Sequence, residues 1–189
     1  MAIKLKSNSA YDGQLQETNT AARQYYLPNN DSGLGTQLMT AQASTSGTSV
    51  DFSGIPSWAK RITVMFNGVS TNGTSHNQVQ IGAGSVTTSG YTSAHSITNS
   101  AGSNLVTATS GFIVMQLTAA SDSYAGSLIL TLVSGNVWVA MGSGYRIGTA
   151  ATMSFAGNIS LGGVLDRVRV TTVNGTDTFD AGSINVMYE

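Results

Sequence analysis

The stretch SLILTLVSGNVWVAM, residues 127–141, decides the fold class of this chain. Two runs rich in branched and aromatic side chains, residue types that favour strands, flank the tripeptide Ser134-Gly135-Asn136. Gly and Asn in that tripeptide accept the backbone geometry of a tight turn. We therefore predict an antiparallel β-hairpin over this stretch, closed by a short loop that contains Gly135.

Two further segments show the period-two alternation of half-buried strands. They are RITVMF, residues 61–66, and SINVMYE, residues 183–189. Each places its apolar residues on one face and leaves the other face to more polar residues. The aligned apolar residues are Ile62, Val64 and Phe66 in the first segment and Ile184, Val186 and Tyr188 in the second.

The segment LDRVRVTTV, residues 165–173, is a third half-buried strand. Val168 and Val170 share one face, and Arg167 and Arg169 share the opposite face. The dipeptide that follows, Asn174-Gly175, is typical of a turn between two strands.

About eight short strands, turn signals between them and no long amphipathic helix predict an all-β fold. We expect an antiparallel β-sandwich with jelly-roll-like connectivity, and immunoglobulin-like topology is the alternative. Segments 112–117 and 128–133 are apolar on both sides, which either burial between two sandwich layers or contact between chains would explain. The Ser-, Thr- and Gly-rich segment 82–104 is expected to be a surface excursion of the type that carries binding sites.

The composition describes a surface kept soluble by hydroxyl and amide groups instead of charges. Ser and Thr together number 48 of 189 residues, and the formal net charge is −1. Between Ile62 and Tyr145 the single Asp, Glu, Lys or Arg is Asp122. A chain with this charge balance has no basic stripe for nucleic acid or for an anionic membrane, so we expect neither as a partner.

Cysteine is absent, which excludes disulfides and the common zinc signatures, and we expect no metal and no cofactor. The start, MAIKLKSNSAYDG, lacks the apolar run of a secretory signal, and no stretch is long and apolar enough to cross a membrane. We therefore expect synthesis in a cytoplasm without cleavage.

The chain divides near residue 47. Residues 1–47 are predicted to be a mostly irregular N-terminal arm, and residues 48–189 to be the β-sandwich head domain. Pro28 and the Asn, Asp, Ser and Gly residues after it predict a turn within the arm. Such an arm has little core of its own, so we expect it to dock on a partner chain.

Catalytic signals are weak. Asp177 and Asp180 are spaced closely enough for a paired-carboxylate site, but an Asx-rich turn before the last strand explains them better. His76 and His95 are expected in polar loops, with no carboxylate at metal-ligand spacing. Motifs of serine hydrolases, nucleotide-binding loops and zinc proteases are absent from the sequence, so we expect a protein that is not an enzyme.

Aromatic residues are the candidate ligand contacts. Tyr91, in the polar segment 82–104, is the first choice, and Trp58 could stack on a sugar or plug the edge of the sandwich core. Trp138 lies within a predicted strand and is expected in the core or at an interface, and Tyr145 is a further candidate.

Lys60 and Arg61 form an isolated basic pair at the entry to a strand. We expect them to pair with carboxylates such as Asp51 or Asp166, or to keep that strand edge in water and so discourage pairing with other chains.

Two parts of the sequence resemble bacteriophage fibre proteins. YYLPNNDSGLGTQLMT, residues 25–40, resembles a segment that helps pack three chains at the base of phage fibres. Residues 48–189 resemble the distal domain of phage tail-fibre and related virion proteins, through FSGIPSWAKRITVMFNGVSTNGTS (52–75), VQIGAG (79–84) and LDRVRVTTVNGTDTFDAGSINVMYE (165–189). The residues of the arm motif are Tyr26, Leu27, Pro28, Gly35 and Leu38.

The resemblance implies a homotrimeric, non-enzymatic structural protein on the surface of a virion, made in the cytoplasm of a bacterial host. Its expected partners are further copies of itself, other capsid or tail proteins bound through the arm, and host cell-surface glycan. Because no shaft repeats precede the head domain, a short tail fibre and a capsid decoration or cement protein are both open. A polysaccharide depolymerase is a remote alternative.

Overall fold

In the computed structural model, the described residues are 3–4, 14–15, 35–148 and 150–189. The chain divides into two compact units, Met1–Leu34 and Gly35–Glu189. Within the first unit, β1 (Ile3–Lys4) pairs with β2 (Gln14–Leu15) in an antiparallel arrangement. The arm residues Tyr26, Leu27 and Pro28 lie outside the described residues.

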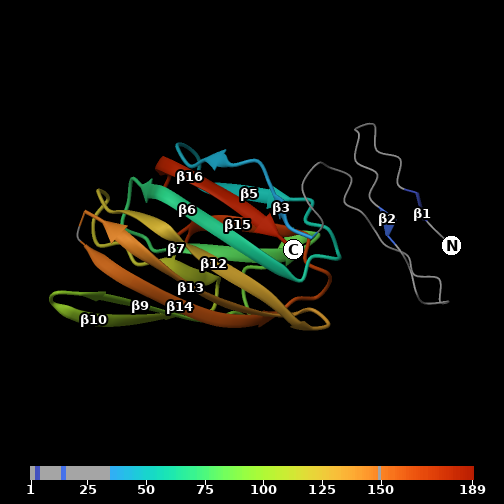
Figure 1. Ribbon diagram of the computed structural model, residues 1–189. Coiled ribbons are helices and arrows are strands. Elements are labelled where there is room, and N and C mark those ends of the chain that lie inside the picture. The colour runs from blue at the N-terminus through green and yellow to red at the C-terminus, as the bar shows by residue number, and fades with distance from the viewer. Residues whose placement is uncertain (1–2, 5–13, 16–34, 149) are drawn as a thin grey trace. The chain divides into compact units, whose positions relative to one another are not determined.

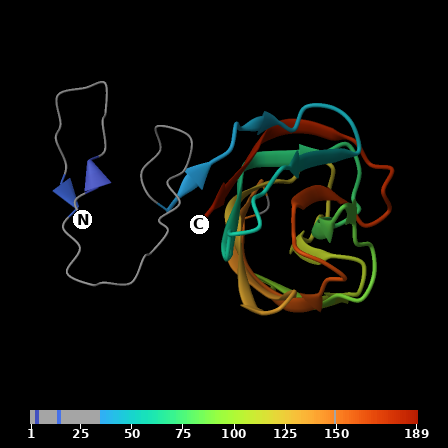
Figure 2. The ribbon, with the colours of Figure 1, turned by 90° about the vertical axis from the view of Figure 1, so that its right-hand side faces the viewer.

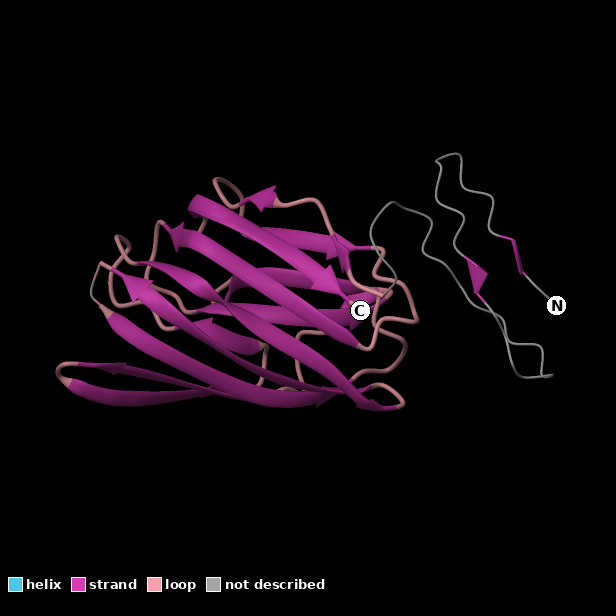
Figure 3. Cartoon of the chain, in the orientation of Figure 1, coloured by secondary structure: helices cyan, strands magenta, loops and turns pink. Residues whose placement is uncertain are grey.

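The second unit is built from two antiparallel sheets, and every regular element described in it is a strand (Figures 1 and 3). The large sheet has the order β10-β9-β14-β13-β12-β6-β16-β3, with β4 also paired to β16. Its strands are β3 (Gln37–Leu38), β4 (Gln42–Ala43), β6 (Arg61–Thr71), β9 (Thr92–Asn99), β10 (Gly102–Ala108), β12 (Ser123–Ser134), β13 (Val137–Ile147), β14 (Ala151–Ser160) and β16 (Phe179–Tyr188).

The small sheet has the order β11-β7-β15-β5, with β8 paired to β7. Its strands are β5 (Ser49–Ser53), β7 (Asn77–Ala83), β8 (Ser85–Val86), β11 (Phe112–Met115) and β15 (Arg167–Thr172). The predicted all-β antiparallel sandwich is thus confirmed. Between β5 and β12 the chain passes back and forth between the two sheets, as it does in jelly rolls. The next strands differ, because β12, β13 and β14 are consecutive neighbours in the large sheet and form a meander.

The predicted hairpin at residues 127–141 is confirmed as β12 and β13. Leu132 pairs with Trp138 and Ser134 pairs with Val137, so that Gly135 and Asn136 form the loop. Gly135 has a φ of 54°, a left-handed conformation that glycine adopts without steric cost. The alternation predicted for β15 is confirmed as well, since Val168 and Val170 are fully buried.

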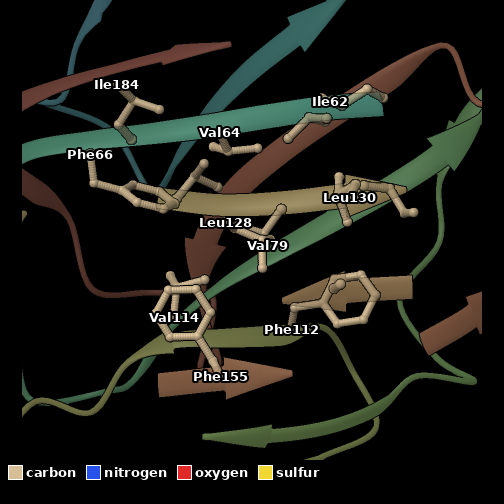
Figure 4. Packing of buried hydrophobic residues seen from close by; sticks show 14 of the residues in the cluster. Ile62, Val64, Phe66, Val79, Phe112, Val114, Leu128, Leu130, Phe155 and Ile184 are labelled. Atoms are coloured by element: carbon tan, nitrogen blue, oxygen red, sulfur yellow. The ribbon is translucent and has the colours of Figure 1, made fainter. Parts of the chain in front are cut away.

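One hydrophobic core lies between the two sheets, whose strands surround a common interior (Figure 2). Leu128 and Leu130 of the large sheet lie across this interior from Val79 of the small sheet (Figure 4). All four residues of β11 are buried within the chain, which explains why this segment is apolar on both sides. Contact between chains is therefore not needed to explain β11.

The prediction of a surface excursion at residues 82–104 is wrong, because this segment contains β8, β9 and the start of β10. The residues of β9 that point into the core are Ser93, His95 and Ile97. Only one of these three is aliphatic, so the alternation that marks a strand is hidden. The number of short strands is accordingly larger than the eight expected.

The boundary of the arm also moves, from the predicted residue 47 to residue 34. Residues 35–47 belong to the second unit, where β3 and β4 pair with β16. Met39 donates its backbone N–H to Val186 O at 2.8 Å, and Ser44 donates to Gly182 O at 3.0 Å. These residues extend the large sheet instead of forming an irregular arm. No described residue lies in a helix that could cross a membrane.

Candidate functional site

The outward face of the large sheet is the principal surface feature of the second unit. On β9, β12, β13 and β14, one set of alternating side chains enters the core, and the other set points away from it. All of the outward residues on these four strands are uncharged. They are Thr92, Ala94, Ser96 and Thr98; Ser123, Ala125, Ser127, Ile129, Thr131 and Val133; Val137, Val139, Met141, Ser143, Tyr145 and Ile147; and Thr152, Ser154, Ala156, Asn158 and Ser160.

A line of exposed apolar side chains runs along β13 on this face, and we call it the β13 ridge. Its members are 37% to 64% exposed, with Met141 the most exposed. The register places Met141 between Ile129 of β12 and Ala156 of β14. An exposed apolar line of this length is a candidate for contact with another molecule. The ridge consists of Val137, Val139, Met141, Tyr145 and Ile147.

Beside the ridge, two hollows over β14, β9 and β10 form what we call the small-residue groove. The hollows have volumes of about 490 and 220 Å³, and Ala94 and Ala156 line both of them. The groove exists because Ala, Ser and Thr side chains rise little above the sheet at these positions. Leu105 of β10, 66% exposed, lines its outer side at the edge of the sheet.

A second surface feature surrounds Trp58, in the loop before β6. The Trp58 ring is 44% exposed and makes an edge-on contact with Tyr188, with ring centroids 5.5 Å apart. The Tyr188 hydroxyl donates to Gln37 Oε1 at 3.1 Å, which fixes the second ring. Trp58 therefore covers the end of β16 with part of its surface and offers the rest to solvent, a geometry that suits stacking on a sugar ring.

The predicted partners of the basic pair beside Trp58 are wrong. Arg61 pairs with Glu189, at 3.2 Å between Nη1 and Oε1, because β6 and β16 are neighbours in the large sheet. Lys60 donates to the backbone oxygen of Ser57 at 3.4 Å.

Asp51 and Asp166 are instead bound by the two arginines of β15. Arg169 binds Asp51 and Arg167 binds Asp166 through paired hydrogen bonds of 2.7 to 3.0 Å. The hydrogen bond from Arg167 holds the pKa of the Asp166 carboxyl below its usual value.

Tyr91 is not available to a ligand, contrary to its selection as the first candidate. It is 2% exposed, and its ring packs edge-on against Phe112 with centroids 4.9 Å apart. Its hydroxyl accepts from Ile81 N–H at 2.8 Å and lies 2.9 Å from the carbonyl oxygen of Thr87, to which it can donate. Burial raises the pKa of Tyr91 to about 12. Tyr91 is a core residue that joins β7 to the start of β9.

His95 also differs from its prediction, because it lies within β9 and is fully buried. Its ring stacks on Phe155 of β14 with centroids 6.0 Å apart, and neither ring nitrogen hydrogen bonds to another residue. Burial, with a smaller contribution from His76, lowers the pKa of His95 to about 4. His76 lies between β6 and β7, where burial lowers its pKa. Within the described residues, no group of three His, Cys, Asp or Glu could hold a metal ion.

Asp177 forms hydrogen bonds typical of a turn, as the structural interpretation of this pair predicts, whereas Asp180 lies within β16. Asp177 accepts from the backbone N–H of Ser75 at 2.9 Å and from Asn174 Nδ2 at 2.6 Å. Asp180 accepts from the hydroxyl of Ser70. Asp177 thus holds the loop after β6 against the segment before β16, and Asp180 joins β16 to the end of β6.

The remaining candidates divide between core and surface. Trp138 is 3% exposed, as expected for a core residue, whereas Tyr145 belongs to the β13 ridge. Of the arm motif, Gly35 and Leu38 are described, and Leu38 is 63% exposed on β3, opposite Met187. The ridge was not predicted from the sequence. A signal for it is present, because all five residues of VWVAM, residues 137–141, are apolar, so both faces of this strand are apolar.

The chain matches no protein-family model, no curated protein and no solved structure with which it was compared.

Proposed function

We propose that this chain is a non-enzymatic structural protein of a bacteriophage virion surface. In this proposal it is a short homotrimeric fibre, anchored by its N-terminal arm, that presents the β-sandwich to glycan on the host cell. The observation that carries the proposal is the uncharged outward face of β9, β12, β13 and β14, with the apolar β13 ridge along it. Such a face suits a protein that works by contact with other protein surfaces.

The state of the carboxylates favours a structural role over an enzymatic one. Asp51, Asp122 and Asp166 each pair with an arginine, Asp177 accepts a hydrogen bond from the backbone of Ser75, and Asp180 accepts one from Ser70 of β6. Groups held in this way stabilise turns and strand ends. A depolymerase would lose hydrolysis of host glycan in Asp177→Asn or Asp180→Asn, and a structural protein has no such activity to lose.

Trp58 is the proposed glycan contact. Its exposed surface is apolar, and Lys60 and Arg61 nearby supply hydrogen-bond donors. Three copies on one fibre would add avidity to a weak single contact.

The test measures binding of the purified full chain to cells of the host bacterium and to polysaccharide purified from them. Trp58→Ala should weaken binding by about tenfold, which corresponds to about 1.4 kcal/mol. Val164→Ala is the matched control, because Val164 is 58% exposed in the loop after β14 and should leave binding unchanged. A chain that neither binds cells nor blocks phage adsorption would contradict attachment.

Capsid decoration is the second candidate, because an uncharged apolar face suits packing on a protein lattice as well. Imaging of intact particles with a labelled antibody separates the two. Label at the tail tip supports the fibre, whereas label over the head, with particles that lose heat stability without the protein, supports decoration.

A further inference from the structure

The β13 ridge and the small-residue groove lie side by side on one face, and they are complementary in form. The ridge carries the protruding side chains of Val139, Met141 and Tyr145. The groove, one to three strands away, is lined by Ala94, Ala156 and other small residues. On such a face, the small-residue groove of one molecule can hold the β13 ridge of a second molecule.

We propose that further copies of this chain cover this face, with the β13 ridge of one copy in the small-residue groove of the next. The inference rests on the homotrimer of the proposed function and identifies the surface through which its copies meet. A contact between two different patches is heterologous, and repetition of such a contact closes into a ring when the rotation between copies allows it.

The charge pattern favours a copy of this chain as the occupant. Every outward residue of β9, β12, β13 and β14 is uncharged, so the face attracts neither a basic nor an acidic partner. A partner that buries no unpaired charge against it must itself be uncharged over a similar area. The same chain supplies such an area.

The size of the face fits a stable interface between proteins. Five strands from β12 to β10, about 4.8 Å apart and about ten residues long, span roughly 24 Å by 33 Å, or about 800 Å². In the ring, each copy covers its ridge with one neighbour and its groove with the other, so the face contributes about 400 Å² to each of two interfaces. The three interfaces of a trimer would then bury about 2,400 Å² in total, which is within the range of stable assemblies.

The first experiment measures the mass of the full chain in solution by light scattering. The unchanged chain should be a trimer, and Met141→Glu should raise its dissociation constant about a hundredfold or more, because the carboxylate would be buried without a partner. Val164→Glu is the matched control, since it places the same charge on an exposed apolar residue away from the face and should leave the trimer intact. Circular dichroism verifies that each variant is folded.

The second experiment tests the ridge-in-groove arrangement itself and uses the absence of cysteine from the chain. Met141 and Ala94 lie two strands apart, roughly 9.6 Å, too far for a disulfide within one molecule. A chain with both Met141→Cys and Ala94→Cys should form, on oxidation, disulfide-linked products up to three copies. Each single cysteine variant should remain unlinked, because neither residue meets its own counterpart.

Three results would overturn the inference. They are a monomer at every concentration, a trimer that survives Met141→Glu, and a double-cysteine chain that forms no link between copies. A product that stops at two copies would replace the three-fold ring with two-fold pairing. If Ala94→Trp abolishes glycan binding by a monomer, the groove holds sugar instead of a second copy.

The two proposals fail separately. If the unchanged chain forms a trimer that Met141→Glu disrupts, but does not bind cells, only the proposed function is contradicted. If the chain binds cells and its trimer stays intact in the Met141→Glu variant, only this inference is contradicted.

Discussion

The guanidinium of Arg146 lies 3.7 Å from the carboxylate of Asp122, between Nη1 and Oδ2, and both side chains are 2% exposed. The single charged side chain between Ile62 and Tyr145 is therefore buried beside an arginine. Asp122 also accepts hydrogen bonds from the backbone N–H groups of Thr118 and Ala119. Burial acts to raise the pKa of Asp122, but these hydrogen bonds and Arg146 together hold it below its usual value.

Asp122→Asn should lower the free energy of unfolding by about 3–5 kcal/mol, because it removes the buried carboxylate that lies beside the buried guanidinium of Arg146. Urea unfolding at a fixed protein concentration measures the loss. Asp51→Asn is the control, since Asp51 pairs with Arg169 in a largely exposed position and should cost no more than about 1 kcal/mol. Equal losses in the two variants would contradict this account of the buried pair.

Tyr91→Phe should destabilise the second unit by about 1–3 kcal/mol. The change removes the acceptor of Ile81 N–H and leaves that buried group unsatisfied. Tyr145→Phe, on the exposed ridge, should change stability by less than about 0.5 kcal/mol. Hydrogen exchange gives a local measurement, since the Ile81 amide should exchange faster in Tyr91→Phe. Unchanged exchange there would show that the hydroxyl does not hold this amide.

Acid should weaken the fold through His95. Its pKa is about 4 in the folded chain and near 6.5 when unfolded, so the unfolded chain binds more protons between these values. The stability due to neutral His95 is complete above pH 6.5 and is lost as the pH falls towards 4, by roughly 3 kcal/mol in total.

Replacement of His95 provides the control for this pH dependence. His95→Phe keeps a ring against Phe155 and has no titrating nitrogen, so its unfolding free energy should vary less between pH 6.5 and 4. Thermal melts across this range compare the two proteins. If both lose stability equally on acidification, another group is responsible.

Gly182→Ala should cost at least about 2 kcal/mol. Gly182 has a φ of 93°, and a Cβ there would lie 2.5 Å from the backbone of Gly68, where β16 departs from regular register with β6. Gly175→Ala is the control, because Gly175 also has a positive φ of 69° but faces open space, and it should cost only about 1 kcal/mol. Equal costs would mean that the close contact with Gly68 contributes nothing.

The sequence predicts the fold where one strand face is aliphatic, and it fails where buried positions hold polar residues. Val168 and Val170 alternate with arginines, so β15 is visible from the sequence alone. In β9, the buried Ser93 accepts from the backbone N–H of Ile113 at 3.0 Å, and this distant partner makes its burial possible. No local pattern shows such a partner, which is why segment 82–104 was expected in solvent.

The same limit applies to the candidate sites. Arg61 meets Glu189 because the register of β6 with β16 brings the two together, and the order of strands in a sheet is a long-range property. The groove likewise depends on Ala94 and Ala156, which pair across β9 and β14. The exposed side of Trp58 and the apolar residues of β13 can be found in the sequence, but their surroundings cannot.

The position of β16 beside β6 has a consequence for the synthesis of the protein. Ser70 and Asp180, which meet across these strands, are 110 positions apart. At about 5–20 residues per second, a ribosome needs on the order of ten seconds to make the intervening chain. During that interval the edge of β6 that pairs with β16 has unpaired backbone N–H and C=O groups, and the large sheet is complete only after β16 has been translated.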